Sequence, residues 1–363
     1  MNVLLTGGFG FLGQSILYFL LHHKEVREIY LPVRRKHGAS VQARLLDVLR
    51  GLGLPPDDRI KTFESSLDSP QFGLDDVEYS QLSTNTHVVI HCAGNVKFNV
   101  GYSESYRDNV ATTLEVLRFG RKKRMVYIST AYVARPGAGG GGGGGHVPMH
   151  DDHFNNYTRT KLMGEHVFEQ AVDFTIVRPS IISSAWSHPQ MYSGSNGLGG
   201  MLELFHAFLL NCVNPSLSIN SVPVDYVGES VVKISLAHAP RYVVLAAEQN
   251  ITDFPHVHET RRVLVTKNEN TWMAVQSFLF LRYFKLGRLT MNVHKYVLST
   301  YPLRTYSFVP DVRVVDLYPD FDQERWVRSI SERSRENVVK KIDLGFLAKP
   351  LLFSLFLLLI AYY

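Results

Sequence analysis

Three glycines near the start of the chain constrain its fold more than any other feature of the sequence. Gly7, Gly10 and Gly13 are spaced three residues apart, after the apolar run Asn2–Thr6 and before Leu12–Leu21, where apolar residues recur at helical spacing. An apolar run that glycines interrupt at once is typical of a buried parallel strand. Glycines in such a turn let the backbone approach a pyrophosphate, whose charge is stabilised at the helix N-terminus. A purely structural turn is the alternative, but the setting between strand and helix favours nucleotide binding. The residues expected to contact the nucleotide here are Thr6, Gly7, Gly10, Phe11, Leu12 and Gly13.

Short apolar runs then recur along the chain, with stretches between them that are long enough for a helix. They lie at Ile29–Val33, His87–Cys92, Met125–Ile128 and Phe174–Val177. This alternation predicts an α/β fold with a doubly wound parallel sheet, of the Rossmann type. With 363 residues, the chain is long enough for one large α/β domain or two modest ones.

The alternation fades after about residue 235, which we take as the end of the nucleotide-binding domain, residues 1–235. Residues 236–343 are expected to form a mainly helical region that caps the substrate end. Within the first domain, seven consecutive glycines run from Gly139 to Gly145. Such a run cannot hold one backbone conformation cheaply, so residues 137–146 are interpreted as a flexible surface insertion. A phosphate-binding loop is disfavoured because the flanking strand, lysine and hydroxyl are missing.

The remaining 20 residues, 344–363, are predicted to be an apolar membrane-anchor tail. The last 13 residues, Leu351 to Tyr363, carry no charge, and Lys349 and Pro350 interrupt the apolar segment before them. The tail is marginal in length for a transmembrane helix, and packing on the protein's own core is the alternative. Lysines before the apolar run favour a catalytic domain that faces the cytosol, with the endoplasmic reticulum or peroxisome surface as the expected location.

Composition excludes several other classes of protein. Hydrophobic residues make up 45% and charged residues 20%, which argues against disorder. The net charge is only +5, and no basic run is interleaved with aromatics, so nucleic acid is not an expected partner. Cys92 and Cys212 are both in apolar contexts and are interpreted as reduced thiols. No metal is expected: the one suggestive histidine spacing, His256-x-His258 beside Glu259, is interpreted as a surface feature.

The residues at the end of the second apolar run distinguish proteins that bind NAD from those that bind NADP. Sites for NAD place an acid there to hold the ribose 2′-hydroxyl, whereas a 2′-phosphate needs cations. The run ends Val33-Arg34-Arg35-Lys36, with no acid in reach along the sequence. The chain is therefore expected to bind NADPH, with Arg34 and Lys36 contacting the 2′-phosphate, although a solvated basic turn is the alternative.

A tyrosine, a lysine and an upstream hydroxyl form the candidate catalytic set. Tyr157 and Lys161 are four residues apart, a spacing that puts both on one face of a helix. A nearby ammonium is expected to lower the phenol pKa from about 10 by roughly one to three units, making Tyr157 a proton donor to a carbonyl. The buried run Val126–Ile128 ends in Ser129 and Thr130, hydroxyls that can orient that carbonyl. In this order the three pieces are a stronger signal than the common Tyr-x-x-x-Lys alone.

These stretches resemble the extended short-chain dehydrogenase/reductase superfamily, and specifically its fatty acyl-CoA reductase family. The glycine turn and the Tyr157–Lys161 pair are typical of the superfamily. Three further stretches point to the acyl reductase branch: Val96-Lys97-Phe98, Ser129-Thr130-Ala131-Tyr132 and Pro223-Val224-Asp225. The resemblance covers roughly residues 1–235.

The resemblance implies a role for each matching residue. Thr130 with Ser129 supplies the hydroxyl, Tyr157 is the acid, and Lys161 contacts both the cofactor ribose and the phenol. Residues implied to contact or border the cofactor, besides those of the turns and the Tyr–Lys pair, are Cys92, Ala93, Gly94, Arg178, Pro179 and Ser180, and Asn109 is implied to support the active-site helix. The chain departs from the family at Ser66, where an adenine-binding aspartate is usual.

The implied reaction is NADPH-dependent reduction of a long-chain acyl-CoA to a fatty alcohol through the aldehyde. Two alternatives stay open. A membrane-tethered sterol or hydroxysteroid dehydrogenase would share the cofactor and Tyr–Lys signatures. A catalytically impaired NADPH-binding protein would bind the cofactor without turnover, and Ser66 and the Gly139–Gly145 run are the features that suggest it. Acyl chain length and oligomeric state are not encoded in any recognisable pattern.

Overall fold

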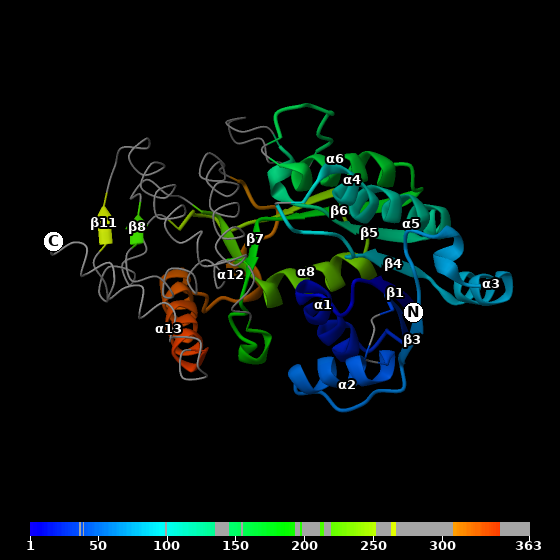
Figure 1. The fold of residues 1–363 in the computed structure, drawn as a ribbon, viewed down its shortest axis with the longest axis horizontal. Coiled ribbons are helices and arrows are strands. Elements are labelled where there is room, and N and C mark those ends of the chain that lie inside the picture. Colours follow the sequence, from blue (N-terminus) through cyan, green and yellow to red (C-terminus); the bar gives the residue numbers. More distant parts are fainter. Residues whose placement is uncertain are drawn as a thin grey trace, which may run out of the picture.

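The computed structural model of the chain describes the parts that position the candidate site (Figure 1). They are residues 1–35, 38, 40–98, 100–134, 145–153, 155–192, 197, 211–213, 219–251, 263–265 and 308–341. The predicted insertion therefore lies outside the described residues except for its last two positions, and the predicted tail 344–363 lies wholly outside. Within the described part, no helix combines the length and apolar character needed to cross a bilayer.

A seven-stranded sheet forms the centre of the fold, and every pairing in it is parallel. Its strand order is β10-β6-β5-β4-β1-β2-β3. The strands are β1 (Asn2–Thr6), β2 (Glu28–Val33), β3 (Ile60–Glu64), β4 (Val88–His91), β5 (Arg124–Ile128), β6 (Asp173–Pro179) and β10 (Tyr242–Leu245). This order confirms the predicted doubly wound Rossmann fold, with the direction of winding reversing between β1 and β4.

Helices cover both faces of the sheet (Figure 1). The helices of one layer are α3 (Asp76–Asn85), α4 (Tyr102–Tyr106), α5 (Thr112–Gly120) and α6 (Asn156–Phe168), with the single π-turn η2 (Arg107–Ala111) joining α4 to α5. On the other face lie α1 (Phe11–His22), α2 (Val41–Gly51) and α8 (Val224–Leu236). The helices α1 and α8 approach closely because Gly228 has no side chain: a Cβ there would lie 2.2 Å from the Ser15 hydroxyl oxygen.

Successive side chains of a strand point to opposite faces of the sheet, so the apolar core lies in two clusters, one on each face. In β1, Val3 and Leu5 belong to the cluster under α1 and α8, whereas Leu4 belongs to the cluster under α5 and α6. All three side chains are fully buried. A central strand covered on both faces needs a continuous apolar run, which is why this segment does not alternate with polar residues.

The sheet continues past residue 235, where the sequence placed the end of the domain. Strand β10 follows α8 and pairs with β6, so the strand–helix alternation ends one strand later than predicted. Asp311 covers the outer edge of β10: its backbone N–H donates to the Val244 carbonyl at 3.0 Å, and its carboxylate accepts from the Val244 N–H at 2.7 Å. A covered edge is protected from pairing with another chain.

The C-terminal part of the described chain packs back onto the first 235 residues. It comprises α12 (Val314–Leu317) and α13 (Gln323–Lys341). The Trp326 ring of α13 is fully buried and donates its indole N–H to the Ser184 carbonyl at 2.9 Å. Most of the predicted helical region lies outside the described residues, so its helical character stays a prediction. Two short pairs of strands and three 3₁₀ turns complete the description. The pairs are β7 (Ile181–Ser183) with β9 (Ser221–Pro223) and β8 (Asn211–Val213) with β11 (Val263–Val265), and the turns are η1 (Pro70–Gly73), η3 (Ala131–Val133) and η4 (Pro189–Met191).

Candidate functional site

The glycine turn after β1 has no room for side chains at two positions. Gly7 has a φ of +73°, and a Cβ there would lie 2.7 Å from the Ala93 backbone nitrogen. A Cβ on Gly13 would lie 2.0 Å from the Gly7 carbonyl oxygen. Because both neighbours are backbone atoms, neither contact can be relieved by moving a side chain. The turn is thus fixed by packing against the segment that follows β4, next to the point where the winding of the sheet reverses.

The N-terminus of α1 fits a dinucleotide pyrophosphate. Its N-cap is Gly10, no side chain caps it, and no acid occupies its first turn. The first backbone N–H groups of a helix have no partners within the helix, and they carry partial positive charge. Gly10 also has little room for a side chain, since a Cβ there would lie 3.2 Å from the Gly7 carbonyl oxygen. Phe11, Leu12 and Gly13 therefore present their amides where an anion can be bound, as the glycine spacing predicts.

A buried polar pair joins β1 and β4 beneath this turn. The Thr6 hydroxyl contacts His91 Nδ1 at 2.7 Å and accepts from the Ala93 N–H at 3.1 Å. The other imidazole nitrogen of His91 lies 3.1 Å from the Thr113 hydroxyl. Burial, with a smaller contribution from Lys161, lowers the pKa of His91 to about 3, so the imidazole is neutral. His91 was not predicted as a site residue; its place as a polar residue inside an apolar strand was the available signal.

The turn after β2 presents cations, as predicted, but acids are also close. Arg34 and Arg35 are exposed, and Lys36 lies outside the described residues. The expectation that no acid is in reach is wrong, because the neighbouring strand brings Glu64 to within 3.9 Å of Arg35. Asp68 lies nearby as well: the Ser66 hydroxyl donates to it at 2.6 Å and lowers its pKa, with smaller effects from Arg34 and Arg107. Among these basic residues Arg34 has no acid paired with it within the described part of the chain.

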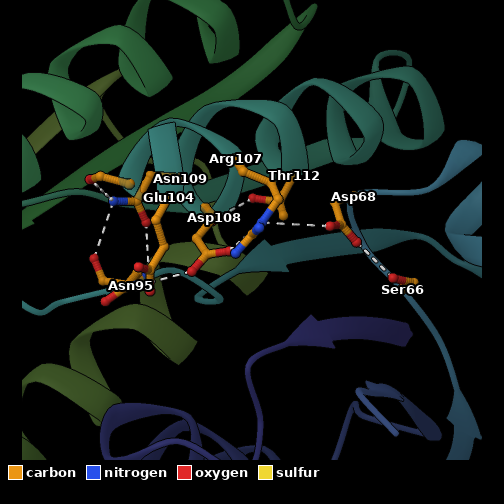
Figure 2. Close-up of polar contacts among 9 residues, drawn as sticks. Ser66, Asp68, Asn95, Glu104, Arg107, Asp108, Asn109 and Thr112 are labelled. Atoms are coloured by element: carbon orange, nitrogen blue, oxygen red, sulfur yellow. Dashed lines mark hydrogen bonds and ion pairs between the residues drawn. The ribbon is translucent and has the colours of Figure 1, made fainter. Parts of the chain in front are cut away.

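A chain of polar contacts runs from Ser66 to Asn109 (Figure 2). Arg107 bridges Asp68, at 3.9 Å, and Asp108, at 3.3 Å. The Asn95 side chain in turn donates to the Asp108 carboxylate at 3.0 Å. These contacts tie the segment after β3 to the π-turn and to the segment after β4.

Asn109 connects this series of polar contacts to the active-site helix, α6. Its side-chain oxygen accepts from the Asn95 N–H at 2.7 Å, and its Nδ2 donates to the Thr160 hydroxyl of α6 at 3.0 Å. Gly94 makes the approach possible, because a Cβ there would lie 2.9 Å from Asn109 Oδ1 and 3.3 Å from Lys161 Nζ. Asn109 thus lies where the resemblance implies, in support of α6.

Tyr157 lies in the first turn of α6, beside Thr130, which acts to lower the phenol pKa. The helix begins there because Asn155 caps it, accepting from the Thr158 N–H at 2.9 Å. The predicted lowering of the phenol pKa is wrong: burial raises the pKa of Tyr157, and the hydrogen bond from Thr130 offsets this only in part. The phenol is therefore fully protonated at neutral pH.

Lys161 is buried, and its ammonium group points at β5. The Nζ atom donates to the Ile128 carbonyl at 2.6 Å and lies 3.4 Å from the Tyr127 hydroxyl and 4.6 Å from the Tyr127 ring centre. Because the ammonium group is directed at β5, burial rather than the charge of Lys161 sets the pKa of the Tyr157 phenol. Burial lowers the pKa of Lys161 to about 8, with opposing contributions from Cys92 and Glu165. Tyr127, which holds the ammonium, was not predicted from the sequence.

Two of the residues implied by the resemblance, Ser129 and Ser180, have hydroxyl groups near the active-site helix without a hydrogen-bond partner among the residues that the structure describes. The hydroxyls of Ser129 and Ser180 are buried at the carboxyl ends of the neighbouring strands β5 and β6, and within the described chain neither has a hydrogen-bond partner. A buried hydroxyl without a partner is costly, so these positions fit contact with a bound group. Cys92 directly follows β4, with its backbone against Gly7, and burial raises the pKa of its thiol to about 12, which keeps it neutral. Pro179 contributes its carbonyl, which accepts from the Thr130 hydroxyl at 3.4 Å.

Arg178 is placed differently from its implied position beside the nicotinamide. Its side chain is 2% exposed and forms a two-pronged ion pair with Glu165 of α6, at 3.0 and 2.7 Å. A third nitrogen donates to the Gly145 carbonyl at 2.7 Å, and the guanidinium lies over the Tyr242 ring. The assignment of its side chain to the cofactor is therefore corrected: alternation along β6 turns it to the face under α6, where it is a structural residue.

Comparison with known proteins agrees with this geometry. Residues 5–231 match the family described as "Male sterility protein". The chain belongs to this family. Human "Fatty acyl-CoA reductase 1" is 28% identical over an alignment 282 residues long, which covers 66% of this chain and 54% of that protein. The chain spans about half the length of the curated relatives it matches. The resemblance to the fatty acyl-CoA reductases that the sequence motifs indicated is thereby confirmed.

Solved structures of other proteins share this fold at low sequence identity. The terminal R domain of the myxalamid PKS-NRPS pathway superposes with a TM-score of 0.65 at 20% identity, covering 85% of this chain and 79% of that one. The PhqB reductase domain of Penicillium fellutanum gives a TM-score of 0.65 at 18% identity, covering 94% and 93%. These matches establish the fold. Together with the glycine turn, the uncapped α1 terminus and the free hydroxyls, it fits a nicotinamide dinucleotide at the carboxyl edge of the sheet.

Proposed function

We propose that this protein reduces a long-chain fatty acyl-CoA with NADPH, giving the fatty alcohol through the aldehyde. The observation that carries the proposal is the buried Tyr157 phenol, which lies beside Thr130 and stands one helical turn from the buried Lys161. Family membership and the names of the relatives support an acyl-CoA as the substrate. The cations after β2 support NADPH over NADH.

The residues of the chain supply the proton and the orientation that the reduction needs. When bound, the nicotinamide cofactor supplies the hydride to the acyl carbon. Tyr157 holds its proton at neutral pH, since the ordinary phenol pKa of about 10 already lies well above 7 and burial raises it further, so the proton is available to the acyl oxygen as negative charge builds there. Thr130 lies beside this phenol and orients the carbonyl. The resulting hemithioacetal releases CoA as the thiol and leaves an aldehyde, and a second hydride and proton convert the aldehyde to the alcohol.

A coupled assay tests the proposal against its alternatives. The full chain is incubated with palmitoyl-CoA and NADPH while NADPH oxidation, thiol release and lipid products are measured. We expect one CoA and two oxidised NADPH for each alcohol formed. Turnover of a hydroxysteroid without release of CoA would identify a sterol-type dehydrogenase. Tight NADPH binding with no turnover of either substrate would identify a catalytically impaired protein.

The cofactor preference is expected to depend on the cations after β2. Replacing Arg34 and Lys36 with alanine should lower the preference for NADPH over NADH about 10- to 100-fold for each residue replaced, because each charge-assisted contact to phosphate contributes about 1.5–3 kcal/mol. The dissociation constants of both cofactors, measured by fluorescence titration, give the ratio. Arg35→Ala is the matched control, since its guanidinium already lies beside Glu64. Equal affinities of the unmodified protein for NADPH and NADH would contradict the assignment.

We also propose that residues 344–363 attach the protein to a membrane, with the catalytic domain on the cytosolic side of the endoplasmic reticulum or peroxisome. The support is the run of 13 uncharged residues at the end of the sequence, preceded by lysines. As a helix this run is about 20 Å long, shorter than a hydrocarbon core of about 30 Å, so shallow insertion is expected. Full-length protein should sediment with membranes after detergent-free lysis, and a chain ending at residue 343 should not. Recovery of the full-length protein in the soluble fraction would favour packing of the tail on the protein itself.

A further inference from the structure

Two histidines and a glutamate converge at the C-terminal end of α6, on the side of the helix away from the glycine turn and the cofactor edge. His166 lies in the last turn of α6 and Glu169 is its C-cap, while His146 belongs to the segment that re-enters the described structure at residue 145. One potential ligand atom from each of the three residues lies within 4.8 Å of the others. The sequence offered no signal for this cluster, because His146 is twenty residues away from His166.

The hydrogen bonds of the cluster define which nitrogen of His166 is free. Its Nε2 lies 2.9 Å from the Val147 carbonyl, which can only accept, so Nε2 carries the proton. The Nδ1 atom of His166 then has a lone pair and lies 3.8 Å from Glu169 Oε2. His146 Nδ1 lies 2.9 Å from the other carboxylate oxygen, Oε1. Two nitrogens and a carboxylate therefore face one point.

The spacing of these atoms matches the needs of a tetrahedral cation. Zinc binds imidazole nitrogens and carboxylate oxygens at about 2.0–2.2 Å, which puts neighbouring ligand atoms of a tetrahedron about 3.4 Å apart. His146 Nδ1 lies 2.9 Å from Glu169 Oε1 and His166 Nδ1 lies 3.8 Å from Glu169 Oε2, so the distances from the two imidazoles to the carboxylate lie on either side of this value. The three potential ligand atoms lie within 4.8 Å of one another, so side-chain rotation that draws them together by about 1 Å would complete the geometry.

Further contacts hold the ligands in place, as the outer contacts of metal sites do. The Val147 carbonyl orients the His166 ring, and the Tyr242 hydroxyl donates to Glu169 Oε1 at 2.8 Å. A ligand imidazole that donates its second N–H to a carbonyl, and a carboxylate that accepts a further hydrogen bond, are the usual surroundings of a bound metal. The His146 side chain is 50% exposed, so water can reach a fourth coordination position.

We propose that His146, His166 and Glu169 bind a divalent cation of the zinc class through two imidazole nitrogens and one carboxylate oxygen. The cation takes the place of the proton that His146 Nδ1 shares with Glu169, and the neutral imidazole carries its proton on Nε2 instead. Two imidazole ligands select zinc-like cations over magnesium and calcium, which prefer oxygen ligands. This inference does not depend on the proposed reductase activity.

The position of the site indicates what the cation does. His146 directly follows Gly145, whose carbonyl accepts a hydrogen bond from Arg178. Arg178 in turn is paired with Glu165 of α6, the helix that also carries His166. A cation would fasten the end of the glycine-rich segment to α6, the helix that carries Tyr157 and Lys161. We therefore assign it a stabilising role at the outer end of this helix.

Titration of the full chain with Zn²⁺ tests the site. The protein must carry no polyhistidine tag and be freed of metal by chelator and dialysis. Calorimetry should then show one equivalent of Zn²⁺ bound, and Zn²⁺ should raise the thermal unfolding midpoint. The double variant His146→Gln/His166→Gln should lose at least 100-fold in affinity and lose the thermal shift. Glu169→Gln, which keeps the size of the side chain, should lose at least 10-fold.

A matched double variant separates this site from general binding to surface histidines. His22→Gln/His23→Gln removes two neighbouring imidazoles at the end of α1, on the other face of the sheet, and should leave Zn²⁺ binding unchanged. Substitution with Co²⁺ gives a second readout, since a four-coordinate N/O site produces visible absorption that the His146/His166 variant should lack. Absence of stoichiometric binding, equal binding by the His146/His166 variant, or loss of binding only in the His22/His23 variant would overturn the proposal.

Discussion

Replacing Tyr157 with phenylalanine is expected to lower acyl-CoA reduction by about 10²- to 10⁴-fold, the usual contribution of a positioned general acid. Affinity for NADPH should change by no more than a few-fold. The phenol hydroxyl is needed only when negative charge builds on the acyl oxygen, so its loss acts on the transition state and leaves ground-state binding almost unchanged.

Steady-state kinetics with palmitoyl-CoA and a separate NADPH titration distinguish the two effects. Tyr102→Phe is the matched control: its ring is 42% exposed on α4, and its hydroxyl contacts the Met163 sulfur. It should keep near-normal kcat/KM. If Tyr157→Phe retained more than about a tenth of the normal rate, another residue would be the proton donor and the whole assignment of the site would fail.

The fold was readable from the sequence because its signals are local. The apolar run Asn2–Thr6, the glycines that follow it and the helical spacing of Leu12–Leu21 each depend on neighbours within a few residues. The structure confirms all three as β1, the turn and α1. The end of the domain was placed one strand early because β10 lies close to the point where the pattern weakens. Its burial depends on β6 and on Asp311, a contact far along the chain that no local pattern encodes.

The sequence predicted those parts of the site that depend on spacing within one element or at the end of one strand. Tyr157 and Lys161 share α6, and Thr130 follows β5 directly, so spacing along the chain was enough to bring them together. The direction of the Lys161 ammonium was not predictable, because it is set by the Ile128 carbonyl and Tyr127 on a strand 33 residues away. For the same reason the phenol pKa was predicted with the wrong sign: spacing reveals a nearby charge but not the burial that outweighs it.

Arg178 shows a related limit of motif reasoning. Its place in a family motif at the end of β6 implied contact with the cofactor. In the structure, alternation along the strand directs the guanidinium to the opposite face, where Glu165 compensates its buried charge. An ionised arginine this deeply buried requires such a partner. The sequence contained both residues, but the pairing becomes visible only when β6 and α6 are packed together.

Lys161→Met is expected to be the second highly damaging change, and it should differ from Tyr157→Phe in kind. Methionine keeps the length of the side chain and removes the ammonium. We expect both a large loss of turnover, on the order of 10²-fold or more, and a loss of cofactor affinity, because the resemblance assigns the ammonium to the cofactor ribose, which must be held in place for hydride transfer. In the unmodified protein, cofactor affinity should decline as pH rises through about 8, where Lys161 loses its proton.

Lys161→Met should also change how the free energy of unfolding depends on pH, an effect that can be measured without any assay of activity. Burial lowers the pKa of Lys161 from 10.5 to about 8, so between these pH values the unfolded chain holds a proton that the folded chain has released. The free energy of unfolding of the unmodified protein therefore gains a contribution as pH rises across this window, of about 3 kcal/mol in total. Lys161→Met lacks this contribution, so the stability of the unmodified protein relative to the variant should increase by about that amount from pH 7 to pH 10.5. Urea unfolding of both proteins at several pH values measures the difference. Parallel pH profiles would show that the ammonium is solvated in the folded state, and the buried position assigned to Lys161 would have to be abandoned.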